Sequence, residues 1–209
     1  MVSETDPKVP EATRLEELWA GSFGDLYSAR NEEAGVGRDA FWDRLLIEHP
    51  VRNVLEVGCG LGANLQWLVP HVAPGEVYGV DVNQAALGRV RERLRTVNAV
   101  TAAARSLPFR DRWFDLAFTT GVLIHQPDST LPLVMAEIVR VSRRFVLCGE
   151  YRADEQTEVA YRGESGALFK RDYGRLYSEL FPELKPVDEG FLGRADGWDD
   201  VTWWLFEKA

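Results

Sequence analysis

Three glycines at alternate positions, Gly58, Gly60 and Gly62, close the stretch 54–62, Val-Leu-Glu-Val-Gly-Cys-Gly-Leu-Gly. Glycine lacks the Cβ atom that would keep a ligand away from the backbone, so an apolar run that ends in this pattern predicts a buried strand leading into a ligand-binding turn. An acid, Glu56, lies two residues before the first glycine. Its charge would repel a pyrophosphate and favours a ligand with donors or positive charge, such as a ribose, an amine or a sulfonium.

A second acid, Asp81, follows the next apolar run, 77–80. It lies about 20 residues beyond the glycine turn, where a Rossmann-like unit places the carboxylate that binds a ribose diol. The glycine spacing, G-x-G-x-G, differs from the G-x-G-x-x-G of dinucleotide-binding proteins. A lone glycine turn could bind nothing, but the acid at this distance favours a nucleoside ligand over an empty turn.

Together, Glu-x-Gly-x-Gly-x-Gly and Gly-Val-Asp resemble motifs I and II of the class I S-adenosylmethionine-dependent methyltransferases. The apolar stretch 114–125, which ends in a polar turn, resembles motif IV of the same family. The resemblance implies S-adenosylmethionine as cofactor and no metal. It implies a set of cofactor-binding residues: Tyr27, Arg30, Glu56, Gly58, Gly60, Gly62, Asn64, Asp81, Val82, Ala104, Arg105, Thr120 and Gly121.

At two places the expected site cannot be taken directly from the family motifs. Family members often place an acid near 103–109 to bind the adenine amino group, but Ala104 and Arg105 stand here, so we expect backbone contacts instead. In similar methyltransferases, aromatic and basic residues ahead of the first strand close over the cofactor. Segment 13–36 is therefore predicted to be a lid in which Tyr27 and Arg30 hold the methionyl carboxylate, although core packing of these aromatics is the alternative.

Apolar periodicity predicts alternating helices and strands along the whole chain. This alternation favours a Rossmann-like, doubly wound α/β fold with right-handed crossovers, and the family resemblance implies a mostly parallel seven-stranded sheet with an antiparallel C-terminal hairpin. Adjacent Trp203 and Trp204 should point to opposite faces of their strand. The predicted helices are 13–21, 38–48, 83–95, 128–140 and 169–180, and the predicted strands are 54–57, 77–80, 98–102, 114–120, 144–150, 186–191 and 201–206.

Methyl transfer from a sulfonium is an in-line displacement, so the protein must mainly align the reactants and exclude water. An ammonium or hydroxyl acceptor would also need a base, for which Glu150, at the end of a central strand, is preferred over His125 and Tyr161. His125 has a suitable pKa range, but a structural hydrogen bond to the backbone is the preferred interpretation. The phenols of Tyr161, Tyr173 and Tyr177 could face the positive sulfur through cation–π contact, or pack in the core.

The C-terminal third, with Tyr-Arg-Gly-Glu and Leu-Phe-Lys-Arg-Asp, resembles a bacterial subgroup described as pseudaminic acid biosynthesis-associated methylases. Azetidine-2-carboxylate synthases resemble the same subgroup and cyclise S-adenosylmethionine, with methylthioadenosine as the leaving product. Three hypotheses follow: a methyltransferase acting on a small polar metabolite at N or O, which we prefer, a cyclase, and a non-catalytic cofactor-binding module.

Net charge, the lengths of apolar runs and chain length restrict the expected partners, location and domain organisation. A net charge of −9 argues against nucleic acid as a partner, because phosphate binding needs a basic patch, and favours a small-molecule substrate. The sequence contains no apolar run of about 18 residues and no signal-peptide pattern, so we expect a cytoplasmic protein without a membrane partner. Length predicts one domain over residues 1–209, with 1–11 as a flexible tail. The sequence leaves the choice between monomer and homodimer open.

Overall fold

The computed structural model describes residues 11–32, 35–164 and 166–209. Of the tail predicted over 1–11, only Glu11 lies within the described residues, and it begins the first helix. The rest of that prediction lies outside them, as do residues 33 and 34 of the predicted lid. Within the described part of the chain, no helix has the length and apolar character needed to cross a membrane.

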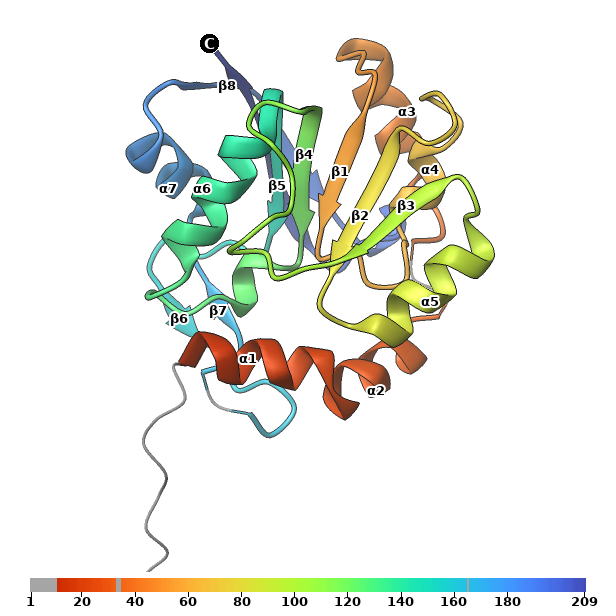
Figure 1. Ribbon diagram of the computed structural model, residues 1–209. Helices are drawn as coiled ribbons and strands as arrows, with labels where there is room; N and C mark the ends of the chain where they lie inside the picture. Colours follow the sequence, from red (N-terminus) through yellow and green to blue (C-terminus); the bar gives the residue numbers. More distant parts are fainter. Residues whose placement is uncertain (1–10, 33–34, 165) are drawn as a thin grey trace, which may run out of the picture.

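A seven-stranded sheet forms the centre of the fold, in the order β3-β2-β1-β4-β5-β9-β8 (Figure 1). The first five strands of this order are parallel, whereas β9 pairs antiparallel with both β5 and β8. This confirms the predicted doubly wound sheet and its C-terminal hairpin. The strands are β1 (Val54–Val57), β2 (Val77–Asp81), β3 (Val97–Thr101), β4 (Phe114–Thr120), β5 (Ser142–Glu150), β8 (Leu184–Leu192) and β9 (Val201–Lys208).

Helices cover both faces of the sheet and bury two separate apolar clusters. Trp204 packs in the cluster that contains Met135, and Trp203 in the cluster that contains Trp42, so these neighbours point to opposite faces as predicted. The helices are α1 (Glu11–Ala20), α2 (Ser22–Arg30), α3 (Asp39–Glu48), α4 (Leu65–Leu68), α5 (Gln84–Arg93), α6 (Leu131–Val141) and α7 (Tyr173–Leu180), with short 3₁₀ turns η1 (Leu123–His125) and η2 (Arg194–Asp196).

The start of α7 differs from the helix predicted over 169–180. Asp172 caps the helix, because its side chain accepts a hydrogen bond from the Arg175 N–H at 2.9 Å. The residues before the cap form β7 (Phe169–Lys170), which pairs with β6 (Thr157–Glu158) in a small separate hairpin. The apolar spacing that predicted a longer helix is therefore interrupted by a capping acid, which that prediction did not take into account.

Helices α1 and α2 lie across the end of the sheet toward which the arrowheads of β1, β2 and β4 point (Figure 1). The side-chain amide of Asn83, which caps α5, fixes this placement. Its nitrogen donates to the Trp19 carbonyl at 3.2 Å and to the Asp25 carboxylate at 2.9 Å. The N-terminal segment thus covers the edge where open α/β sheets bind ligands.

Candidate functional site

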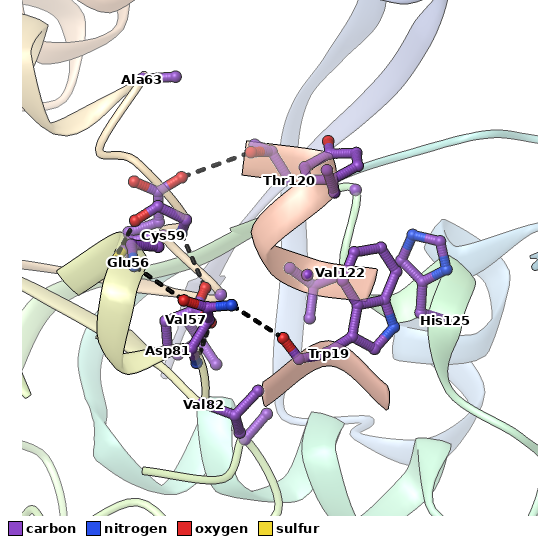
Figure 2. A pocket seen from close by; sticks show the side chains of 18 of the residues that line it. Trp19, Glu56, Val57, Cys59, Ala63, Asp81, Val82, Thr120, Val122 and His125 are labelled. Carbon is purple, nitrogen blue, oxygen red and sulfur yellow. Dashed lines mark hydrogen bonds between the residues drawn. The ribbon is translucent and has the colours of Figure 1, made fainter. Parts of the chain in front are cut away.

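A cavity of about 230 Å³ lies between α1, α2 and the carboxyl ends of the parallel strands. Figure 2 shows Glu56 and Asp81 on one side of it and the rings of Trp19 and His125 on the other. Most of the residues predicted to bind a cofactor line this cavity. They are Tyr27, Glu56, Gly58, Gly60, Asn64, Asp81, Val82, Ala104, Arg105, Thr120 and Gly121.

The three glycines of the turn after β1 differ in their surroundings. A Cβ atom on Gly58, at φ +76°, would lie 2.3 Å from a methyl carbon of Val122, so this position requires glycine. Gly60 also has a positive φ, +50°, but no protein atom lies within 4 Å of its Cβ position, so its backbone borders open cavity. Gly62 does not line the cavity, because it faces the side chains of Val90 and Leu94.

Asp81, at the end of β2, connects the two ligand-side turns. One carboxylate oxygen accepts a hydrogen bond from the Gly60 N–H at 2.8 Å, and the other accepts one from the Asn83 N–H at 2.8 Å. Burial raises the pKa of this carboxyl, while these N–H groups act in the opposite direction. Asp81 therefore holds the glycine turn in place and also presents its carboxylate to the cavity.

Glu56, near the end of β1, has one carboxylate oxygen without a partner. Its Oε1 accepts hydrogen bonds from Asn64 at 2.6 Å and from the Thr120 hydroxyl at 3.5 Å. Its Oε2 is buried and meets no donor among the described residues. Burial raises the pKa of Glu56 to about 8. A buried, unsatisfied acceptor on a cavity wall fits a ligand that brings a donor or a positive charge.

Arg38 also lines the cavity, although it belongs to none of the motifs in the sequence. Its guanidinium lies 4.0 Å above the Trp198 ring and donates to the Asn64 side-chain oxygen at 2.8 Å and to the Gly197 carbonyl at 2.9 Å. The predicted Arg30 instead lies exposed at the end of α2 and does not line the cavity.

Glu150, the preferred catalytic base, lies beneath the loop that follows β4 and does not line the cavity. Its Oε1 accepts hydrogen bonds from the N–H groups of Val122 at 3.1 Å and Leu123 at 3.0 Å, and its Oε2 accepts one from Ile124 at 3.3 Å. The side chain is fully buried, which raises its pKa to about 7. Both oxygens are therefore occupied by backbone donors, and Glu150 holds the loop.

His125 lines the cavity but is a weak base. Its Nδ1 lies 2.5 Å from the carbonyl of Ala167, which can only accept, so Nδ1 carries the hydrogen of the neutral ring. Burial lowers the pKa of His125 to about 4. The ring packs against Trp19, 4.5 Å between centroids, and against Tyr161, 5.3 Å away, which itself lies outside the cavity lining.

Tyr173 and Tyr177 lie in the apolar core and do not reach the cavity. The hydroxyl of Tyr173 donates to the Phe169 carbonyl at 2.8 Å, and Tyr177 packs on Phe206 with ring centroids 5.4 Å apart. Both face the sheet from α7, whose buried residues include them. Of the four tyrosines that follow β5, which are Tyr151, Tyr161, Tyr173 and Tyr177, only Tyr151 lines the cavity.

Solved structures with this fold include methyltransferases that were determined with a demethylated cofactor. The 1,6-didemethyltoxoflavin-N1-methyltransferase of Burkholderia thailandensis, with S-adenosylhomocysteine, matches 99% of this chain and 93% of its own, with a TM-score of 0.73 and 18% identity. The N-methyltransferase NodS of Bradyrhizobium japonicum WM9, also with S-adenosylhomocysteine, matches 96% of this chain and 99% of its own, with a TM-score of 0.67 and 20% identity.

Sequence comparison agrees with the fold. A family model described as a methyltransferase domain matches residues 54–144. This part of the chain thus resembles a methyltransferase domain, within a Rossmann-like methyltransferase fold. The chain is 35% identical to the malonyl-[acyl-carrier protein] O-methyltransferase of Halorhodospira halophila over 56% of this chain and 42% of that protein. It is 30% identical to a 24-methylenesterol C-methyltransferase of Oryza sativa over 69% of this chain and 40% of that protein. The chain thus spans less than half the length of these curated relatives.

These matches support the S-adenosylmethionine prediction, and the cavity fits that ligand at its charged and backbone groups. Within the superfamily fold, the motif-like part of the site was predictable from sequence, whereas Trp19, Arg38, Trp198 and Asp199 on the cavity wall were not. None of these four belongs to a spaced motif. Two of them precede β1 and two precede β9, and only the folded structure brings these two segments together at the cavity.

Proposed function

We propose that the chain is an S-adenosylmethionine-dependent methyltransferase that acts on a small polar metabolite at N or O. The observation that carries this proposal is the unpaired buried oxygen of Glu56, which faces the same cavity as Asp81 and the open backbone of Gly60. A ligand with a ribose and an amine would satisfy these groups. The resemblance to the pseudaminic acid biosynthesis-associated methylases supports a small metabolite as acceptor, within a single cytoplasmic domain over residues 1–209.

Each group on the cavity wall has a proposed role toward the cofactor. Asp81 accepts hydrogen bonds from the ribose hydroxyls, and Gly60 lets the methionyl part approach the backbone. Glu56 Oε2 accepts from the ammonium, and Arg38 replaces Arg30 as the cation nearest the methionyl carboxylate. The adenine lies toward Ala104, where Arg105 is already held by two hydrogen bonds to Glu16 at 2.6 and 3.0 Å.

The bound cofactor supplies a methyl group on a positively charged sulfur. The protein's own residues align and enclose the reactants, and good alignment can contribute roughly 7 to 11 kcal/mol toward the barrier. His125 stays neutral at pH 7 and is a weak base, and Glu150 is held by backbone donors. We therefore assign the described residues to alignment and exclusion of water rather than to strong base catalysis. The names of two structural neighbours, both N-methyltransferases, support nitrogen as the acceptor atom.

The lid over residues 13–36 is part of this proposal. Trp19 packs edge-on against Phe23 and Tyr27, with centroids 5.2 and 5.3 Å apart, and contacts the sheet edge through Asn83 and His125. We expect S-adenosylhomocysteine to slow amide hydrogen exchange over 13–31, because the ligand would add contacts beneath these helices. Identical exchange with and without ligand would make the segment ordinary core packing.

A Gly60→Ala substitution tests the proposed backbone approach to the cofactor. The new methyl group would meet no protein atom within 4 Å but would occupy cavity space, so we expect a folded protein whose affinity for S-adenosylhomocysteine falls at least about tenfold. Gly75→Ala is the matched control, because Gly75 also has a positive φ and open space and lies outside the cavity lining. Calorimetric titration that finds equal affinity in both variants would exclude Gly60 from the binding surface.

A further inference from the structure

The cavity extends beyond the proposed cofactor positions, along the same edge of the sheet, to the ends of β5 and β9. Ala104 lies toward β3, and Glu56 belongs to the central strand β1. At the other side, Tyr151 follows β5, whose last residue pairs with Thr202 of β9, and Val201 and Asp199 precede that pair. A nucleoside bound at Asp81 with its amine at Glu56 leaves this β5–β9 end of the cavity for the acceptor.

Three polar groups at the β5–β9 end have no bound partner. Asp199 forms no ion pair or hydrogen bond with any described residue, and the hydroxyls of Tyr27 and Tyr151 form no hydrogen bond with any described residue. Burial is the main cause that raises the pKa of Tyr27 to about 12, and neighbouring groups that include Asp199 add to it. Burial is also the main cause that raises the pKa of Tyr151, and Asp199 is the next largest. Both phenols therefore stay neutral close to the carboxylate.

The cations on the cavity wall are already engaged. Arg38 is held by Asn64, by the Gly197 carbonyl and by the Trp198 ring, and Arg105 is held by Glu16. Lys170 lies 5.8 Å from the Tyr151 ring but does not line the cavity. Asp199 therefore adds an exposed carboxylate to the cavity lining, and it acts electrostatically on Tyr27, Tyr151 and Arg38.

We propose that the acceptor is a small amine that binds as its ammonium ion, held by Asp199 through charge and by the rings of Tyr27, Tyr151 and Trp19 through cation–π contact. The ammonium loses its proton to solvent, to which Asp199 is exposed, before the neutral nitrogen accepts the methyl group. This inference rests on the proposed function and adds the substrate class. A carboxylate acceptor would be repelled by Asp199, while Arg38 is assigned to the methionyl carboxylate of the cofactor and Arg105 is held by Glu16. An ammonium gains both an ion pair with Asp199 and contact with aromatic faces.

Three probes of similar shape separate charge from size: tetramethylammonium, tert-butanol and pivalate. Each is titrated by calorimetry into the protein saturated with S-adenosylhomocysteine, and tetramethylammonium cannot itself be methylated. We expect tetramethylammonium to bind at least about tenfold more tightly than the other two. Asp199→Asn should weaken tetramethylammonium about tenfold while its affinity for S-adenosylhomocysteine stays unchanged, which also shows that the variant is folded.

Asp200→Asn is the matched control, since Asp200 is adjacent, exposed and outside the cavity lining, and it should bind tetramethylammonium like the unmodified protein. Equal or tighter binding of pivalate, or an Asp199→Asn variant that binds tetramethylammonium normally, would overturn the cationic-acceptor proposal. Absence of S-adenosylhomocysteine binding would instead overturn the proposed function. In that case the same probe comparison in the ligand-free protein still decides whether Asp199 forms a cation site.

Discussion

Replacing Glu150 by alanine is expected to lower the free energy of unfolding by about 3 kcal/mol, because up to three buried N–H groups lose their acceptor and each costs about 1 to 3 kcal/mol when left unsatisfied. The N–H groups belong to Val122, Leu123 and Ile124, in the loop that follows β4. Urea unfolding followed by circular dichroism measures the change. Glu189→Ala, at an exposed position on β8, should alter the same quantity by no more than about 0.5 kcal/mol.

Glu150→Gln distinguishes a structural role from a catalytic one. Glutamine keeps one acceptor oxygen, so we expect a stability between those of the unmodified protein and the alanine variant. A general base at this position would instead show normal stability in both variants and a loss of turnover. That result would contradict the placement of Glu150 beneath the loop.

Stability should fall as the pH rises from 5.5 to 8, and Glu56 should account for much of the fall. Its folded-state pKa of about 8 lies above the value of about 4.3 expected in the unfolded chain. The folded protein therefore holds the proton more tightly, so this group's contribution is fully present below the unfolded pKa and is lost as the pH rises through the folded one. Over this window the loss is on the order of 3 kcal/mol.

Glu56→Gln tests this sign, because glutamine cannot titrate. Urea unfolding at a series of pH values should give a shallower decline for the variant than for the unmodified protein. The remaining slope should have the same sign, because burial also raises the pKa of Glu150, to about 7. Parallel pH profiles for the two proteins would show that Glu56 is already ionised in the folded state.

The fold and the motif residues were predictable because their signals are local. Alternating helix and strand periodicity determines a doubly wound sheet, and the carboxyl ends of β1 and β2 then place Glu56 and Asp81 at one edge. Gly58 and Gly60 have positive φ values, and the presence of glycine at these positions is itself the sequence signal for such a backbone. These features depend on neighbouring residues in the chain, so a single sequence contains them.

The errors concern side chains whose role depends on distant partners. Glu150 ends a central strand, which is a common place for a catalytic carboxylate, but its partners are backbone N–H groups 26 to 28 residues earlier. Arg38 and Asp199 both line the cavity only because the segment before α3 packs against the loop before β9. Tyr173 faces the core because the Asp172 cap sets where α7 begins. The apolar periodicity of the sequence predicts none of these three placements.

Product analysis tests the central claim, S-adenosylmethionine-dependent methyl transfer, most directly. The purified protein is incubated with S-adenosylmethionine alone and with a panel of primary and secondary amines, and each mixture is analysed by mass spectrometry. We predict that S-adenosylhomocysteine accumulates only when an amine is present, together with an amine that has gained one methyl group. Formation of methylthioadenosine and azetidine-2-carboxylate from the cofactor alone would contradict the claim.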